Sequence, residues 1–320
     1  MGNCRATVLV HSPGWGRHMA ELEERFTDVR FVHVDPDGAV PADLAGEILF
    51  AQTFRPSNVA DVLDHGVRWV HSIGHGVDHL PLDLMDDMVV SCSRGVSAVP
   101  IAEWVVAMIL TAVKDLPDSW ADGPPERWSW ANLGSLEGQT VALVGFGSIN
   151  RAVSDRLLPF GANLVAVRRS GAGTDDNGVH LASTIADAVR DADHVVVAVP
   201  VTGETHHLVD AAFLAAMKPE AHLINVARGS VVDQDALRVA LDEGQVGLAS
   251  LDVSEPEPLP AGHWLYGHPG VRLSPHISWS SPAAIQQLFD MFADNLERWL
   301  RGDTPEGIVD LEAGYCPVGM

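Results

Sequence analysis

The stretch "TVALVGFGSINRAV", residues 140–153, decides the fold of this chain. Its short apolar run predicts a β-strand, Gly145 and Gly147 follow at once, and a helical pattern begins behind them. This order is typical of a dinucleotide-binding turn. The first glycine permits the tight turn, and the second lets backbone N–H groups approach a pyrophosphate. Asn150 stands where such a turn has a third glycine, which allows close packing of the helix on the strand.

We therefore expect a dinucleotide turn with one altered packing residue, and an ordinary strand–helix turn is the alternative interpretation. The cofactor contacts predicted for this turn come from Gly145, Gly147, Ser148 and Ile149. Asn150 is either a tolerated packing change or a local weakening of cofactor affinity, and the sequence leaves both open.

The next predicted strand ends in basic residues. "NLVAV" is followed by Arg168, Arg169 and Ser170, with no acidic residue. An NAD-binding enzyme places Asp or Glu at this point to bind the ribose hydroxyls, whereas guanidinium groups suit a 2′-phosphate. The pattern predicts that NADP(H) is the preferred cofactor, with Arg168 and Arg169 as contacts. Two solvated surface arginines are the alternative interpretation, and NAD(H) then remains usable.

Short apolar, β-branched segments alternate with helical segments along most of the chain. They fill the first hundred residues and recur from residue 140 to residue 276. This alternation predicts an α/β protein with two doubly wound parallel-sheet domains. A helix that is apolar nearly all round is expected at residues 100–116, and an amphipathic helix at residues 282–300.

Composition and charge exclude several classes of protein. The formal net charge of −23 argues against a nucleic acid or an anionic membrane as a partner. Cys4, Cys92 and Cys316 are widely spaced and form no C-x-x-C pair, which argues against a disulfide framework or a zinc site. No apolar run reaches the roughly 18 residues that span a bilayer, and the start of the chain shows no signal-peptide pattern. A cytoplasmic protein is expected.

Three later predicted strands each lead to one chemically useful residue, namely Arg228, Glu257 and His276. Ligands bind beyond the carboxyl ends of parallel strands, so these residues are expected to lie near one another. An arginine can hold a carboxylate in a two-pronged grip, a histidine can pass a proton, and a glutamate can orient that histidine. Each residue alone has an ordinary structural explanation. Together, downstream of a nucleotide turn, they predict a catalytic site.

These motifs make the sequence recognisable, because it resembles the D-isomer-specific 2-hydroxyacid dehydrogenases, which include glyoxylate/hydroxypyruvate reductases and phosphoglycerate dehydrogenases. The resemblance covers nearly the whole chain and rests on "VGFGSINR", "MKPEAHLINVARGSVVDQDAL", "LDVSEPEPLP", "LSPHISW" and "WVHSIGHGVDHL". It implies hydride transfer between a nicotinamide cofactor and a small acid, interconverting a 2-oxo acid and a D-2-hydroxy acid, and we expect a reductase. The alternative is a non-catalytic, dinucleotide-sensing protein like the co-repressors of that family.

The resemblance also implies roles for residues outside the catalytic set. Backbone N–H groups around His75 and Gly76 would hold the substrate carboxylate beside Arg228. Asp252 would form a hydrogen bond with the nicotinamide carboxamide. The segment that lines the cofactor would contain Val199, Pro200 and Thr205.

The same resemblance supplies a domain plan. A flavodoxin-like substrate domain would comprise residues 1–98 and 286–320, and a Rossmann cofactor domain, residues 99–285, would be inserted in it. The apolar helix at residues 100–116 would then pack across a two-fold axis, so a homodimer is expected.

His71, His75 and His79 recur every four residues, a spacing that on a helix would suggest a metal site. Residues 69–73 read as a strand, however, and Gly74 and Gly76 would break any helix. No metal is therefore expected. The sequence does not indicate which 2-oxo acid is the substrate or in which direction the reaction runs.

Overall fold

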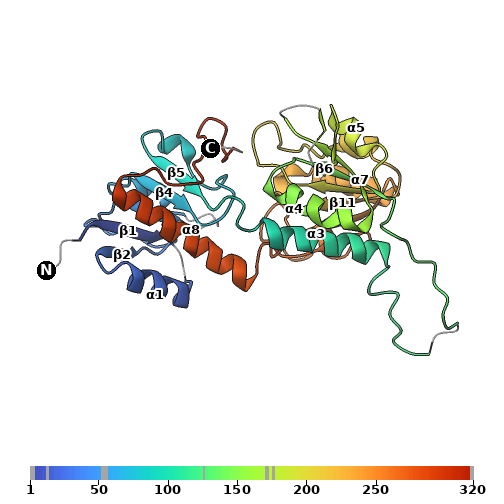
Figure 1. Ribbon diagram of the computed structural model, residues 1–320, viewed down its shortest axis with the longest axis horizontal. Coiled ribbons are helices and arrows are strands. Elements are labelled where there is room, and N and C mark those ends of the chain that lie inside the picture. The colour runs from blue at the N-terminus through green and yellow to red at the C-terminus, as the bar shows by residue number, and fades with distance from the viewer. Residues whose placement is uncertain are drawn as a thin grey trace. The chain divides into compact units, whose positions relative to one another are not determined.

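The computed structural model describes residues 4–11, 14–51, 57–124, 127–169, 173–174 and 177–317 (Figure 1). The chain forms two compact units, one made of Met1–Ser97 with Ser280–Met320 and the other of Ala98–Trp279. Each unit is built around its own, predominantly parallel β-sheet, with helices packed on it (Figure 1). The expected α/β fold with two doubly wound parallel sheets is confirmed.

The first unit holds a five-stranded parallel sheet in the order β2-β1-β3-β4-β5, which is the flavodoxin-like order. Val8 in β1 lies in register with Phe31 on one side and with Ile48 on the other. The strands are β1 (Ala6–His11), β2 (Val29–His33), β3 (Ile48–Ala51), β4 (Trp69–Ser72) and β5 (Val89–Cys92). The helices are α1 (Gly16–Arg25), α2 (Val59–Leu63), the 3-10 turn η1 (Leu82–Leu84) and α8 (Pro282–Arg301).

Alternating strand residues of this sheet face two separate apolar layers. On one face, Phe50 and Trp69 stack on Phe292 of α8, with ring centroids 4.1 and 5.7 Å apart. On the other face, Leu49 and Val70 pack with buried residues of α2. The C-terminal helix therefore covers the sheet formed by the N-terminal part of the chain.

Helix α8 sets one border between the units. Its N-cap is Ser281, whose side chain accepts a hydrogen bond from the backbone N–H of Ala284 at 3.1 Å. The inserted unit ends before it, at Trp279. A border between residues 285 and 286, as the domain plan has it, would cut this helix inside its first turn. The amphipathic helix expected at residues 282–300 is present.

The second unit holds an eight-stranded sheet in the order β13-β12-β11-β10-β6-β7-β9-β8. From β6 the order runs outward through β7 and β9 on one side and through β10 to β13 on the other, as in a Rossmann sheet. The strands are β6 (Thr140–Val144), β7 (Asn163–Val167), β8 (Gly173–Thr174), β9 (His180–Leu181), β10 (His194–Val197), β11 (Ala221–Asn225), β12 (Val246–Leu251) and β13 (Val271–Leu273). Only β8 is antiparallel to its neighbour among the described strands.

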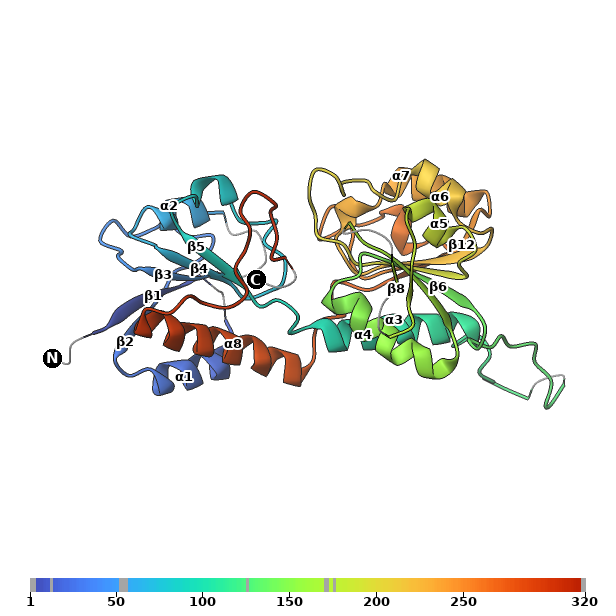
Figure 2. The same cartoon turned by 45° about the horizontal axis from the view of Figure 1, so that its top comes forward.

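The helices of this unit lie in two layers (Figure 2). They are α3 (Ala98–Val113), α4 (Ser148–Leu157), α5 (Ile185–Val189), α6 (Ala211–Ala216) and α7 (Gln234–Asp242), with the 3-10 turns η2 (Leu158–Phe160), η3 (Gly229–Val231) and η4 (Trp264–Tyr266). Leu143, Val196 and Ile224 pack with α3 and α4, whereas Val144 and Val197 pack with α5 to α7. Because both faces are covered, the strand ends are left to carry the polar chemistry.

The structure differs from the sequence-based expectation in two local respects. The two-residue strands β8 and β9 were not expected, because they are too short to show a periodicity. Helix α3 ends at Val113, short of residue 116. It ends there because Asp115 adopts a left-handed conformation (φ 51°) and the N–H of Leu116 turns back to the carbonyl of Thr111 at 2.9 Å.

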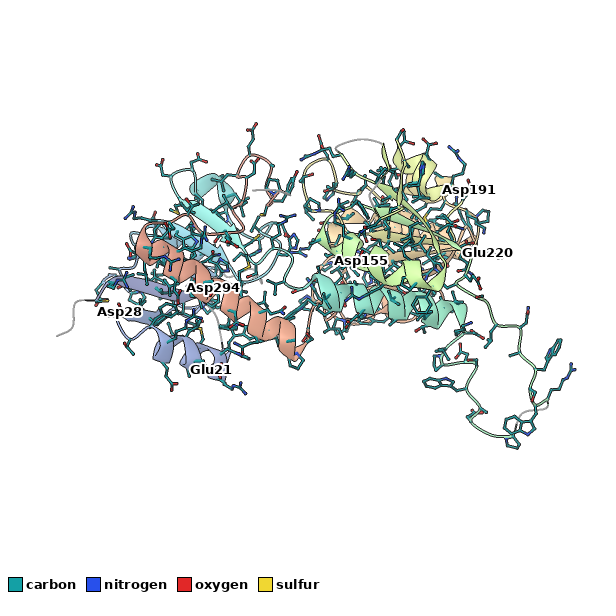
Figure 3. The ribbon with its side chains drawn as sticks, viewed as in Figure 1. Glu21, Asp28, Asp155, Asp191, Glu220 and Asp294 are labelled. Carbon is teal, nitrogen blue, oxygen red and sulfur yellow. The ribbon has the colours of Figure 1, made fainter. Side chains whose placement is uncertain are left out.

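Acidic side chains lie on the outside of both units (Figure 3). Glu21 and Asp294 are exposed on the first unit, and Asp155, Asp191 and Glu220 on the second (Figure 3). Because these carboxylates are solvated, the folded protein tolerates its high negative charge. Among the described residues, no helix has both the length and the apolar character that crossing a membrane requires.

Candidate active site

The glycine turn joins β6 to α4 at the centre of the second sheet. Gly145 has a φ of 84°, and a Cβ there would lie 2.6 Å from the carbonyl oxygen of Ala198 and 2.7 Å from Val199 Cγ1. Only glycine fits such a turn. Gly147 is the N-cap of α4, and a Cβ there would meet nothing within 4 Å. Packing within the protein therefore does not require glycine at 147. The open space beside it leaves room for a ligand at the N-terminus of α4.

Asn150 links the first turn of α4 to the end of β6. Its side chain is fully buried, and its Nδ2 donates to the carbonyl of Val144 at 3.2 Å and to that of Gly145 at 2.6 Å. These hydrogen bonds tie the helix to the strand where a third glycine would do so by close packing. The turn is therefore kept despite the altered residue.

Unsatisfied polar atoms gather around this turn. Ser148 Oγ, Asn150 Oδ1 and Arg168 Nε are buried, and none has a hydrogen-bond partner within the part of the chain that the structure describes. Buried polar groups are nearly always paired, so their concentration here indicates that a polar ligand completes the site. The residues present fit a nicotinamide dinucleotide.

The other residues predicted to contact the cofactor lie after the ends of strands β7 and β10 or at the start of α4. Arg168 is half-buried and Arg169 exposed directly after β7, whereas Ser170 lies outside the described residues. Ile149 packs against the α3–α4 layer. After β10, Val199 abuts the glycine turn, as its distance to a Cβ at 145 shows. Thr205 orders the next loop, because its Oγ1 donates to the carbonyl of Pro200 at 2.7 Å and accepts from the N–H of Thr202 at 2.8 Å.

The three catalytic candidates follow the ends of adjacent strands β11, β12 and β13. His276 Nδ1–H donates to Glu257 Oε2 at 2.9 Å, and the N–H of Ser254 donates to Glu257 Oε1, also at 2.9 Å. Both oxygens of the glutamate are thus held, and the proton that His276 can transfer resides on Nε2. Arg228 directly precedes η3 and contributes to the potential at Glu257.

Electrostatics favour the ionised form of Glu257. Partial burial raises the pKa of its carboxyl, but the hydrogen bonds from His276 and Ser254 and the charges of His276 and Arg228 outweigh that effect. The pKa of Glu257 therefore lies below its ordinary value of 4.5. At neutral pH the glutamate is an anion that accepts the hydrogen bond from His276 and so orients the imidazole.

Asp252 organises the segment that carries His276. It is only 1% exposed, and its Oδ1 accepts from Ser274 Oγ (2.5 Å) and from the N–H of Ile277 (2.9 Å), while Oδ2 accepts from the N–H of Ser278 (2.9 Å). Its backbone carbonyl accepts from the N–H of His276 at 2.8 Å. The structure thus gives Asp252 a positioning role, and a contact with the nicotinamide carboxamide stays a prediction.

Sequence reasoning missed the close contact that brings the arginine and glutamate segments together. A Cβ on Gly229 would lie 2.0 Å from the carbonyl carbon of Ser254. The glycine after Arg228 therefore allows the turn bearing Glu257 to pass directly against it. The glycine is visible in the sequence "ARGS", but the backbone that it contacts, at residues 254 and 255, lies far away in the sequence.

The histidines at 71, 75 and 79 do not share a helix. His71 lies in β4, fully buried, with Nδ1 2.8 Å from Ser91 Oγ and Nε2 3.2 Å from Ser93 Oγ. Burial lowers its pKa to about 3, so it is a neutral core residue. His75 is exposed on the loop after β4, and the carbonyl of Gly76 accepts from Ser72 Oγ at 3.3 Å. The expected contact of the backbone N–H groups around His75 and Gly76 with a substrate stays a proposal.

A Rossmann sheet with an open glycine turn, and a His–Glu pair beside an arginine at its strand ends, defines a dinucleotide-dependent oxidoreductase. Comparison with known proteins agrees. The family profile described as "D-isomer specific 2-hydroxyacid dehydrogenase, NAD binding domain" matches residues 106–278. The glyoxylate reductase of Thermofilum pendens is 32% identical over 266 residues, which cover 79% of this chain and 78% of that protein.

Two further relatives extend the comparison. The glyoxylate reductase/hydroxypyruvate reductase of Mus musculus is 32% identical over 252 residues, 76% of this chain and 77% of that protein. The crystal structure of the NADPH-dependent glyoxylate/hydroxypyruvate reductase of Sinorhizobium meliloti, with NADP and malonate, superposes with a TM-score of 0.81 at 27% identity, covering 99% of this chain and 100% of the other. The chain belongs to the D-isomer-specific 2-hydroxyacid dehydrogenase family. It is an oxidoreductase that uses a nicotinamide dinucleotide.

Proposed function

We propose that the protein reduces a small 2-oxo acid to the D-2-hydroxy acid, with NADPH as the preferred reductant. The observation that carries the proposal is the 2.9 Å hydrogen bond between His276 and Glu257, which follow the adjacent strands β13 and β12; Arg228 follows the next strand, β11. A proton donor with a fixed orientation and a cation for a carboxylate are the two groups that reduction of a 2-oxo acid requires. The names of the relatives, glyoxylate and hydroxypyruvate reductases, support this choice.

Each residue has a defined task in this proposal. The reduced nicotinamide, when bound, supplies the hydride to the carbonyl carbon. Arg228 holds the substrate carboxylate, and His276 donates the Nε2 proton to the carbonyl oxygen as negative charge develops there. Glu257 keeps the imidazole oriented through Nδ1. The second unit acts as the cofactor domain, and the first unit, through the backbone around His75 and Gly76, as the substrate domain.

A panel of small 2-oxo acids, including glyoxylate, hydroxypyruvate and pyruvate, tests the reaction directly by loss of NADPH absorbance. Turnover of at least one acid is expected, with the D-hydroxy acid as product. Tight NADPH binding without turnover of any of them would favour the dinucleotide-sensing alternative instead. The complete set of Arg228, Glu257 and His276 argues against that alternative, because a sensor has no need of a proton donor with a fixed orientation.

The preference for NADPH rests on the end of β7. Arg168 is half-buried with its Nε unpartnered in the described chain, and no acid follows the strand. A guanidinium there would make a charge-assisted bond to a 2′-phosphate, worth roughly 1.5–3 kcal/mol. In Arg168→Asp the ratio of kcat/KM for NADPH to that for NADH should fall by about 10- to 100-fold. Arg238→Asp, the same charge change on exposed α7, should leave the ratio unchanged.

If the wild-type enzyme prefers NADH, or if the ratio is the same in wild type and Arg168→Asp, these arginines do not contact a 2′-phosphate. The reductase assignment would survive that result, because it depends on His276 and Glu257 and not on the ribose contact. Testing Arg169→Asp in parallel would separate a second phosphate contact from a solvated neighbour.

A homodimer is supported by apolar surface on and beside α3. Val99 of α3 is 48% exposed. The described residues of the segment between α3 and β6, part of which projects away from the rest of the second unit (Figures 1 and 2), include three exposed tryptophans. Trp120, Trp128 and Trp130 are exposed by 69%, 80% and 69%. Exposed aromatic groups of this size mark interaction surfaces. Light scattering should give about twice the chain mass of 34.3 kDa, and a monomer would contradict the dimer.

The cytoplasmic location expected from the sequence stays a prediction.

A further inference from the structure

Three exposed side chains that the proposed reaction does not use converge on the second unit. His206 and His207 lie in the loop after β10, and Glu255 lies in the turn after β12. Their possible ligand atoms all lie within 4.8 Å of one another, and no other group of three such side chains gathers in this way within the described chain. The two segments come together only in the folded sheet.

The backbone of the histidine pair is held in place. His207 adopts a left-handed conformation (φ 50°), and its N–H donates to the carbonyl of Ser230 at 2.8 Å. The N–H of His206 donates to the carbonyl of Thr202 at 3.1 Å. The two rings stack with their centroids 4.1 Å apart and their planes 27° from parallel. Consecutive side chains that would otherwise diverge therefore present their nitrogens on one side.

Glu255 is held in a similar way by its main chain. Gln234 Nε2 donates to the carbonyl of Glu255, and the N–H of Glu255 lies 3.4 Å from Gln234 Oε1. Gly229 packs against the same backbone, because a Cβ on it would lie 2.5 Å from the nitrogen of Glu255. The carboxylate projects from this fixed backbone into solvent.

None of the three side chains makes a hydrogen bond or an ion pair with the protein in the region that the structure describes. His207 and Glu255 also line a cavity of about 290 Å³ whose wall includes Asp235 and His263. The acidic surface of the chain raises the local concentration of cations further.

We propose that His206, His207 and Glu255 form a surface site for a divalent transition metal of the Zn²⁺ type. Two imidazole nitrogens and one carboxylate oxygen are ligands that Zn²⁺ prefers, with water in the remaining position. Ligand atoms about 2.1 Å from a tetrahedral metal are about 3.4 Å from each other. Exposed side chains on a fixed backbone reach that spacing by small rotations about their χ angles.

The test is calorimetric titration of the tag-free, chelator-treated full chain with ZnCl₂, with the absorption bands of Co²⁺ as a second signal for direct ligation. One bound ion per chain is expected in the wild type. His206→Ala, His207→Asn and Glu255→Gln should each weaken binding by at least about tenfold. Asparagine is chosen at 207 because it tolerates the left-handed backbone, so that loss of binding is not loss of folding.

Two control variants locate the ion. His276→Ala removes another imidazole of the second unit that is paired with a carboxylate, and His33→Ala removes an exposed histidine of the first unit. Both should bind Zn²⁺ like the wild type. Absence of stoichiometric binding in the wild type would overturn the site. So would binding that survives Glu255→Gln and His207→Asn but disappears in His276→Ala. Neither readout depends on turnover, so the metal site and the proposed reductase activity can fail separately.

Discussion

Two regions at the carboxyl ends of the strands in the second sheet, the proposed nucleotide end (β6 and β7) and the proposed catalytic end (β12 and β13), treat their polar atoms differently. At the turn between β6 and α4 and at the end of β7, Ser148, Asn150 and Arg168 each leave a buried polar atom unpaired within the described chain. At the ends of β12 and β13, the carboxylates of Asp252 and Glu257 accept hydrogen bonds at both oxygens. Hydrogen bonds within the protein thus order the catalytic end, whereas the nucleotide end leaves polar atoms for a ligand to pair.

This difference has a physical reason. Proton transfer depends on groups that are already oriented when the substrate arrives, because reorganising them during the reaction would raise the barrier. Cofactor binding gains free energy when the ligand itself satisfies donors and acceptors that the protein leaves unsatisfied. Substitutions at the two ends should therefore affect different measured quantities.

The largest expected effect is that of His276→Ala. Loss of the proton donor should lower kcat by about 10²- to 10⁴-fold, because proton transfer by a positioned side chain contributes on that scale. The dissociation constant of the cofactor, measured by protein fluorescence, should stay unchanged, as should all constants of the His33→Ala control. Near-normal turnover in His276→Ala would remove the histidine from the mechanism. A parallel loss of cofactor affinity would show that the two ends are not independent.

Gly147→Ala probes the nucleotide end with little risk to the fold. A Cβ at 147 meets nothing within 4 Å, and the φ of −92° is open to alanine. Thermal stability should be that of the wild type, while the methyl group occupies the space expected to receive the pyrophosphate. Cofactor affinity should fall by at least about tenfold, or 1.4 kcal/mol.

Gly267→Ala is the matched control, since its Cβ would also meet nothing within 4 Å and its φ is −115°. It should change neither stability nor affinity. Unchanged cofactor affinity in Gly147→Ala would mean that the open space beside α4 is not where the dinucleotide approaches.

The smallest expected effect is a pH-dependent stability difference between wild type and Glu257→Gln. The folded-state pKa of Glu257 lies below the ordinary value of 4.5, so ionised Glu257 stabilises the folded protein. That contribution is fully present above the unfolded-state pKa and is lost as the pH falls through the lowered folded-state pKa. Urea unfolding should show the wild type slightly more stable at pH 7, with the difference disappearing below about pH 4. A difference that grows in acid would contradict the assigned direction.

Much of this molecule could be predicted from its sequence. The periodicity of apolar residues and the turn residues predicted the C-terminal helix and the strands of both sheets other than β8 and β9. Gly145 and Gly147 indicated the nucleotide turn, and Arg228, Glu257 and His276 were catalytic candidates because each follows the end of a predicted strand and matches a family motif. Such signals come from residues within a few positions of one another. The local backbone conformation fixes how these residues lie relative to one another.

The tertiary structure decided what depends on residues far apart in sequence. It assigned Nδ1 of His276 to Glu257, made Asp252 the anchor of the 274–278 turn, and showed that Asn150 ties α4 to β6 by hydrogen bonds. It also brought His206 and His207 to Glu255, whereas the regular spacing of His71, His75 and His79 produced no such cluster within the described residues. Hydrogen bonds and ligand sets are made by atoms near one another in space, and only the sheet order and the contacts between strand ends determine which atoms those are.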